Sequence, residues 1–127
     1  MRGPTAVLHR GGRIEALVAP GEVPADCLRN DLPEGALLAP GFIDVQVNGG
    51  GGVLLNDDPS PAGMRAIIAA HRRFGTTGSL PTLISDTRAV TERAVAAARA
   101  MACDPGFLGL HLEGPFLNVA RKGVHRA

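Results

Sequence analysis

The sequence predicts an α/β fold in which the chain forms the start of a parallel-stranded α/β barrel. From residue 39 onward, short apolar strands alternate with amphipathic helices, a pattern that favours a parallel sheet. The last predicted strand, 107–112, delivers Glu113 to its own C-terminal end, just before a break at Gly114-Pro115. Active sites of α/β barrels are built at such strand ends.

Three strands and two helices make only part of a closed barrel. The third strand, 107–112, would be left as a long apolar edge, which soluble proteins avoid. We therefore expect the chain to be an N-terminal piece of a larger protein. The alternative is a compact three-stranded α/β domain that is complete in itself.

Composition excludes several classes of partner. A net charge of +1 gives no electrostatic basis for binding nucleic acid or an anionic membrane. Trp and Tyr are absent, which argues against stacking on bases.

No apolar run reaches the about 20 residues that span a membrane, and the first ten residues lack a signal-peptide core. Cys27 and Cys103 form no metal or redox motif. We expect a cytoplasmic protein with reduced thiols.

Residues 1–38 are predicted to form a separate unit of short β-strands. Segments 6–9 and 13–18 flank Gly11-Gly12, which is a hairpin signal, and a third short strand is expected at 36–38. So few apolar residues cannot stabilise a domain alone. These strands therefore need partner strands from elsewhere, and the boundary to the second unit, 39–127, falls at residues 38 and 39.

The second unit is predicted to begin with a strand at 42–48. Ile43, Val45 and Val47 share one face, which should meet helices, whereas Asp44, Gln46 and Asn48 share the other face with Phe42. The glycine run 49–52 favours a flexible turn over a phosphate-binding loop, because it matches neither phosphate-binding fingerprint.

Two helices are predicted on either side of a second strand. Ser60 and Pro61 are typical of a helix start, and apolar residues recur at helical spacing as far as Phe74, before Gly75. A strand is expected at 76–84, with irregular hydrogen bonding at Pro81. Ser85 and Asp86 should cap a second helix, from Thr87 to about Ala102.

Glu113 is the strongest candidate for chemistry, as a ligand to a divalent metal or as a general base. The alternative is an ion pair with Arg121 or Lys122. His111 shares the face of Glu113 and is expected to be a hydrogen-bonded core residue. His125 lies in a basic, glycine-containing loop and could hold a sugar hydroxyl or a phosphate; alternatively it is an exposed loop residue.

Gln46 and Asn48 lie where metal-dependent hydrolases often have a His-x-His pair. Amides are poor metal ligands but can orient water or substrate. The site should therefore lack one metal position.

Together these motifs resemble the N-acetylglucosamine-6-phosphate deacetylase family of the amidohydrolase superfamily. The resemblance covers residues 37–125 well and the first 36 weakly. The matching stretches are 40–49, Gly75-Thr76-Thr77, 81–84 and Gly109-Leu110-His111-Leu112-Glu113-Gly114-Pro115-Phe116-Leu117-Asn118, extended by Arg121-Lys122-Gly123-Val124-His125.

The resemblance implies a (β/α)8 TIM barrel with a small β-sandwich built from both chain termini, which would accommodate residues 1–38. It implies hydrolysis of N-acetylglucosamine 6-phosphate to glucosamine 6-phosphate and acetate. Glu113 would be the first ligand of one divalent metal ion, with zinc expected. Two histidines and a general-base aspartate would follow beyond Ala127, so no catalytic residue is expected in this chain.

The same resemblance assigns substrate contacts to four residues. The main chain at Val124 and the side chain of His125 would contact the sugar phosphate, and Gln46 and Asn48 match the branch that has lost the His-x-His pair. The only other partner expected is a second copy of the full-length protein, as a homodimer.

Some positions depart from the family pattern. Val119 stands where Pro is common, Val124 is larger than the usual Ala or Thr, and Arg126-Ala127 replaces an acidic or amide residue. Lacking a general base and two metal ligands, the chain alone should have negligible deacetylase activity. The alternatives are another amidohydrolase, such as a dihydroorotase-like or deaminase-like protein, or a non-catalytic fragment or remnant that binds sugar phosphates.

Overall fold

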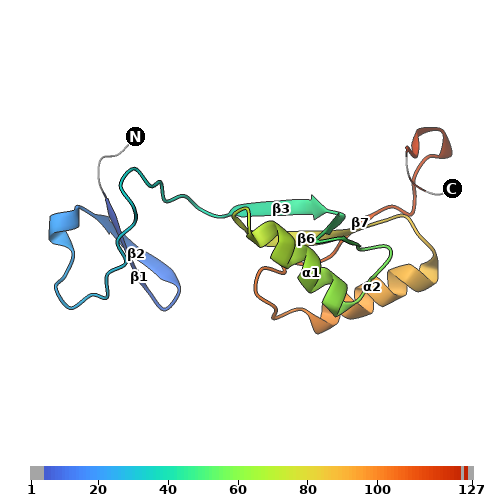
Figure 1. Cartoon of the computed structure of the whole chain (residues 1–127). Helices are drawn as coiled ribbons and strands as arrows, with labels where there is room; N and C mark the ends of the chain where they lie inside the picture. The colour runs from blue at the N-terminus through green and yellow to red at the C-terminus, as the bar shows by residue number, and fades with distance from the viewer. Residues whose placement is uncertain (1–4, 124, 126–127) are drawn as a thin grey trace. The chain divides into compact units, whose positions relative to one another are not determined.

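The computed structural model describes residues 5–123 and residue 125. The chain divides into two compact units, Met1–Leu38 and Ala39–Ala127 (Figure 1). Each unit is described by itself.

The first unit is a β-hairpin followed by a loop. Strands β1 (Ala6–Arg10) and β2 (Arg13–Val18) pair antiparallel. Gly11 and Gly12 have φ angles of 56° and 77°, and two consecutive positive φ angles match the twist of a two-residue hairpin turn. A short 3-10 helix, η1 (Pro20–Glu22), follows.

The prediction of a third strand at residues 36–38 is wrong. This segment has no strand structure, and the Leu37 and Leu38 side chains are 84% and 67% exposed. A strand needs a neighbour to receive its backbone hydrogen bonds, and the described residues of this unit supply only the two strands of the hairpin.

The second unit contains a parallel sheet in the order β3-β6-β7, as the alternating pattern predicted. Strand β3 spans Phe42–Val47, the central strand β6 spans Thr76–Ile84, and β7 spans His111–Glu113. The glycine run forms a turn, also as predicted: β4 (Gly49–Gly50) pairs with β5 (Val53–Leu54).

Two helices pack on one face of this sheet. Helix α1 (Pro61–Arg72) is capped by Ser60, whose Oγ accepts a hydrogen bond from the Gly63 N–H at 3.1 Å. Helix α2 spans Arg88–Ala100. The buried core joins apolar residues of both helices to β3, β6 and the adjoining segments: Val47, Leu55, Met64, Ile67, Ile68, Leu83, Ala94, Ala97 and Met101.

The helix boundaries differ from the prediction at both ends of the intervening strand. Helix α1 ends at Arg72, two residues before Phe74, which is 75% exposed. The cap of α2 is Thr87, whose Oγ1 accepts from the Val90 N–H at 3.3 Å, so the prediction that Ser85 and Asp86 cap it is wrong. The Ser85 side chain therefore does not cap α2.

The strand predicted at 107–112 is shorter and lies nearer to Glu113. Phe107 makes only an isolated bridge to Ser79, and regular pairing with β6 begins at His111. Gly109 separates the two contacts, with a φ of 147° that lies outside the extended range of L residues. Glu113 is the last residue of β7.

Pro81 makes the hydrogen bonding of β6 irregular, as predicted. Because Pro81 has no N–H, the register with β3 shifts between Asp44 and Val47. The Val47 N–H donates instead to Thr82 Oγ1, at 2.9 Å. A buried hydroxyl thus takes the place of a backbone acceptor.

The apolar face predicted for β3 is only partly buried. Val47 is 5% exposed, whereas Ile43 and Val45 are 65% and 61% exposed. Helices α1 and α2 therefore cover β3 only near its C-terminal end.

The Thr82 hydroxyl should contribute measurably to stability. Thr82→Val would leave the buried Val47 N–H without its acceptor and should lower the free energy of unfolding by about 1–3 kcal/mol. The measurement is urea unfolding of the purified protein.

Ser79→Ala is the matched control on the same strand. Ser79 Oγ is buried without a hydrogen-bond partner among the described residues, so its removal should change the free energy of unfolding by less than about 0.5 kcal/mol. Equal stability of the two variants would show that the Thr82 acceptor contributes nothing.

Candidate functional site

Glu113 and the end of strand β6 define one edge of the parallel sheet. Glu113 stands opposite Ile84, the last residue of β6, so the two strands end at the same level. Ser85 and Gly114 are the first residues beyond this edge. The Glu113 side chain is 31% exposed.

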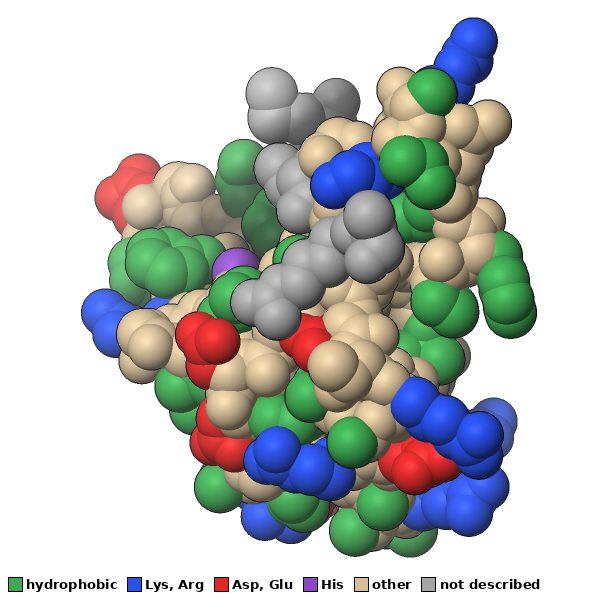
Figure 2. Space-filling model, turned by 90° about the vertical axis from the view of Figure 1, so that its right-hand side faces the viewer, with side chains coloured by type: hydrophobic (Ala, Val, Ile, Leu, Met, Phe, Trp, Pro, Cys, Tyr) green, Lys and Arg blue, Asp and Glu red, His purple; other side chains and the backbone are tan. Residues whose placement is uncertain are grey.

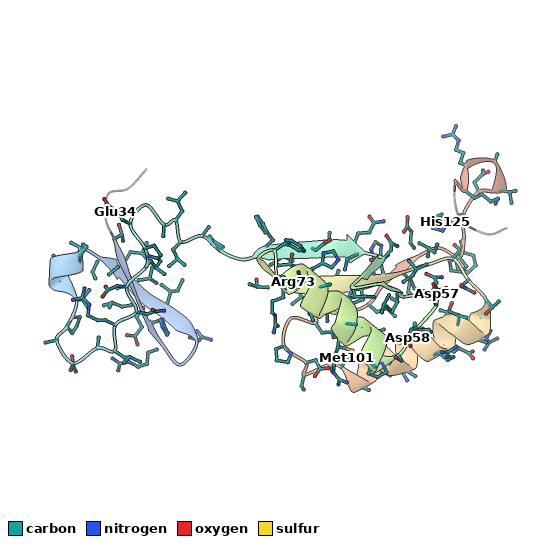
Figure 3. The ribbon with its side chains drawn as sticks, in the orientation of Figure 1. Glu34, Asp57, Asp58, Arg73, Met101 and His125 are labelled. Atoms are coloured by element: carbon teal, nitrogen blue, oxygen red, sulfur yellow. The ribbon has the colours of Figure 1, made fainter. Side chains whose placement is uncertain are left out.

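The side chain of His125 is buried against this edge. His125 is 8% exposed, and its Nε2 lies 3.3 Å from Glu113 Oε1. Figure 3 shows His125 at the C-terminal ends of the strands of the second unit. The alternative of an exposed loop histidine is therefore wrong. Glu113 is paired with His125, whereas Lys122 Nζ donates to the His125 carbonyl oxygen at 2.7 Å.

The contacts of His125 determine where its ring carries a proton. The Ser85 backbone N–H donates to His125 Nδ1 at 3.3 Å. A backbone N–H can only donate, so Nδ1 must be the acceptor nitrogen of a neutral ring. The proton then resides on Nε2, which lies 3.3 Å from Glu113 Oε1.

Ser85 was not recognised as a site residue from the sequence. Its Oγ lies 3.2 Å from His125 Nδ1 and 3.2 Å from the Glu113 carbonyl oxygen. Gly114 permits this approach, because a Cβ at residue 114 would overlap Ser85 Oγ. The signal that could have found Ser85 is its position directly after a parallel strand.

The side chain of Asn56, in the loop before α1, is hydrogen-bonded to residues at the end of β6. Its Nδ2 donates to the Ile84 carbonyl oxygen at 3.1 Å and to Asp86 Oδ2 at 2.9 Å. Its Oδ1 accepts from the Ile84 N–H at 3.3 Å. The residues on both sides of Ser85 are thereby held by one amide.

His111 is hydrogen-bonded, as predicted, but it is half-buried and not part of the buried core. Its Nδ1 lies 3.1 Å from the Val45 carbonyl oxygen and 3.4 Å from Thr82 Oγ1. Because a carbonyl oxygen only accepts, Nδ1 carries a proton in this contact. The ring thus links β7 to β3 beside the central strand.

The two predicted amides lie on or next to β3. Gln46 is exposed, and its backbone N–H donates to Asp44 Oδ1 at 3.0 Å. Asn48 is half-buried, with Nδ2 buried and without a hydrogen-bond partner among the described residues. Within residues 5–123 and 125, no hydrogen bond joins either amide side chain to Glu113 or His125. The predicted contact at Val124 lies outside the described residues.

The donor set was tested against a metal ion. In the part of the chain that the structure describes, no group of three His, Cys, Asp or Glu residues is placed to hold one. Glu113 offers a carboxylate of the right chemistry, but the His125 nitrogen beside it, Nε2, carries the ring proton and so has no lone pair to offer a metal. These residues therefore supply one possible ligand with a protonated ring nitrogen beside it.

The surface agrees with the near-neutral composition. On the face shown in Figure 2, acidic, basic and apolar side chains are interspersed. Among the described residues, no helix is long and apolar enough to cross a membrane.

Comparisons with known proteins connect the chain to one group of enzymes; no family model matches. An N-acetylgalactosamine-6-phosphate deacetylase from a Shewanella species is 50% identical over 96 residues, covering 74% of this chain and 24% of that protein. An N-acetylglucosamine-6-phosphate deacetylase from Haemophilus influenzae is 37% identical over 123 residues, covering 95% of this chain and 32% of that protein.

Structural comparison gives the same answer. The crystal structure of N-acetylglucosamine-6-phosphate deacetylase from Pasteurella multocida matches with a TM-score of 0.91 at 37% identity, over 98% of this chain and 33% of that one. The chain therefore spans about a quarter to a third of the length of these relatives.

The hydrogen bonds of the Asn56 side chain predict an order of stability among Asn56 variants. Asn56→Ala loses three hydrogen bonds and should lower the free energy of unfolding by about 1–3 kcal/mol. Asn56→Asp should be worse, because it places a second carboxylate against Asp86. Thermal and urea unfolding of both variants would check this, and an Asp variant more stable than the Ala variant would contradict it.

The close approach of Gly114 to Ser85 predicts a second effect. In Gly114→Ala, an L residue would have to adopt a φ of 106°, and its Cβ would overlap Ser85 Oγ. Backbone strain alone costs about 1–3 kcal/mol, so the variant should lower the free energy of unfolding by more than this. Gly52→Ala is the control, since Gly52 has a φ of 82° and open space around its Cβ position. Equal losses in urea unfolding would mean that the overlap is relieved without cost.

Proposed function

We propose that this chain, which is homologous to part of the N-acetylglucosamine-6-phosphate deacetylases, carries the first strands and the first metal ligand of such an enzyme. The full-length protein would hydrolyse the acetamido group of an N-acetylhexosamine 6-phosphate to the amine and acetate. The observation that carries this proposal is the meeting of Glu113 and His125 at the C-terminal edge of a parallel sheet, in a chain related to deacetylases over 123 residues.

The exposed apolar residues of both outer strands support continuation into a barrel. On β3, Phe42, Ile43 and Val45 are 69%, 65% and 61% exposed, and on β7 Leu112 is 42% exposed. Such edges require coverage or pairing in a soluble protein. We propose that the remainder of a (β/α)8 barrel covers them.

The first unit has a similar need. On β2, Ile14 and Leu17 are 72% and 53% exposed, and a lone hairpin is marginal in water. We propose that further strands complete it as a small β-sandwich.

In the proposed mechanism Glu113 holds one divalent metal ion, with zinc expected, together with two histidines from beyond Ala127. When bound, the ion supplies a Lewis acid for the amide carbonyl. His125 and the main chain at Val124 bind the sugar phosphate, Gln46 and Asn48 orient substrate, and an aspartate beyond Ala127 acts as general base. We further propose a cytoplasmic homodimer without nucleic-acid or membrane partners.

The preferred substrate is N-acetylglucosamine 6-phosphate. A second candidate, N-acetylgalactosamine 6-phosphate, is favoured by the 50% identity to the Shewanella protein of that name. Acetate release from each epimer under identical conditions separates the two, and the ratio of the kcat/KM values identifies the true substrate.

The decisive experiment is to sequence the coding DNA beyond the codon for Ala127 in all three frames. We expect two histidines and an aspartate at the ends of later strands. A stop codon with no such residues in any frame would overturn the enzyme proposal and leave a non-catalytic remnant.

Glu113 should be essential to the full-length enzyme. Glu113→Gln keeps the shape but removes the charge that a cation needs, so kcat/KM for acetate release and metal content should both fall by about a hundredfold or more. Glu92→Gln is the control, because Glu92 pairs with Arg88 on the exposed face of α2. An active Glu113→Gln variant with full metal content would rule out the assigned role.

A further inference from the structure

We propose that Ser85 is a positioning residue that seats the His125 ring against the Glu113 carboxylate, with Nδ1 toward Ser85 and Nε2 beside Glu113. This role for Ser85 rests on the proposed function of Glu113 as a metal ligand, and goes beyond it by assigning the group that holds a histidine beside that ligand. Ser85 is the first residue after β6 and is 40 residues distant from His125 in the sequence.

The first support is the pair of contacts that Ser85 makes with one ring nitrogen. Its backbone N–H lies 3.3 Å and its Oγ 3.2 Å from His125 Nδ1. The N–H is an obligate donor, so a neutral ring seated here has its only proton on Nε2. Nε2 itself lies 3.3 Å from Glu113 Oε1.

The second support is the tie between Ser85 and the backbone of Glu113. The Ser85 hydroxyl has a single hydrogen and two acceptors at 3.2 Å, His125 Nδ1 and the Glu113 carbonyl oxygen. Whichever acceptor takes the hydrogen, the hydroxyl lies between the ring and the strand end. It therefore fixes the distance between His125 and the residue that His125 orients.

The third support is that Gly114 and Asn56 hold Ser85 in place. Gly114 leaves the space that Ser85 Oγ occupies. Asn56 holds Ile84 and Asp86, the residues immediately before and after Ser85. A hydroxyl with only a capping role in α2 would need neither constraint, and Thr87 already supplies that cap.

The consequence concerns the surroundings of the Glu113 carboxylate. An ionised carboxylate has about four lone-pair sites on two oxygens. With Nε2 seated 3.3 Å from Oε1, the His125 ring limits how the carboxylate can turn toward a cation. Hydrogen-bonding partners of metal ligands typically contribute about 10–100-fold to metal affinity or activity.

The test begins with the tautomer of His125 in the full-length protein. The protein is labelled with ¹⁵N-histidine and long-range ¹H–¹⁵N spectra are recorded in mildly alkaline buffer, with His125→Gln identifying the signals. We expect a neutral ring protonated on Nε2. A ring protonated on Nδ1 would overturn the proposal.

The second measurement compares Ser85→Ala with Ser79→Ala, which removes a buried hydroxyl of β6 that has no hydrogen-bond partner among the described residues. Ser85→Ala keeps the backbone N–H that sets the tautomer and removes only the hydroxyl, so it should shift the His125 ring nitrogen signals without moving the proton to Nδ1. It should also lower metal affinity and kcat/KM by about 10–100-fold. Ser79→Ala should change neither. Unchanged ring signals in Ser85→Ala, or equal effects of the two variants, would overturn the role of Ser85.

These outcomes separate this proposal from the proposed function. The ring signals report on Ser85 and His125 whether or not the protein releases acetate. Absence of acetate release by the unmodified protein, with the expected tautomer and its response to Ser85→Ala, would remove the deacetylase and leave the Ser85–His125–Glu113 contact established.

Discussion

The arrangement of the candidate site depends on the parallel pairing of β6 with β7. Because Ile84 stands opposite Glu113, both strands leave the sheet at the same level. Ser85 and Gly114 then come into contact, and His125 is buried beside them. A shift of one residue in this register would turn Glu113 to the helix-covered face. The pairing therefore decides whether the carboxylate is available for chemistry.

This pairing relies on a central strand that is itself irregular. Pro81 has no N–H to donate to β3, and the Val47 N–H of β3 donates to the Thr82 hydroxyl oxygen of β6. His111 adds a contact from β7 to the Val45 carbonyl oxygen of β3. Side chains of β6 and β7 thus supply hydrogen bonds to the backbone of β3, at the Val47 N–H and the Val45 carbonyl oxygen.

The sequence correctly predicted the features that depend on residues close together in the chain. The alternation of apolar strands with amphipathic helices indicated the α/β class and the parallel strands. Ser60-Pro61 indicated the start of a helix, and the glycine run indicated a turn. Residues 36–38 and 107–110 were assigned to strands from their apolar character, but strand formation depends on a neighbour that the sequence window does not contain. Glu113 was found because it follows an apolar run, whereas Ser85 and Asn56 act on residues 28 to 40 positions away.

The two histidines at this edge show how a neighbour's chemistry sets the role of a side chain. His111 faces a carbonyl oxygen and must donate through Nδ1, whereas His125 faces a backbone N–H and must accept through Nδ1. The residue type is the same, yet one ring links two strands and the other places Nε2 beside a carboxylate. The sequence predicted different roles for the two histidines but not these contacts, since each proton assignment follows from one distant backbone group, the Val45 carbonyl oxygen on β3 or the Ser85 N–H just after β6. The proposed division of labour, with His111 as a structural link and His125 as the partner of Glu113, follows from that difference in partners.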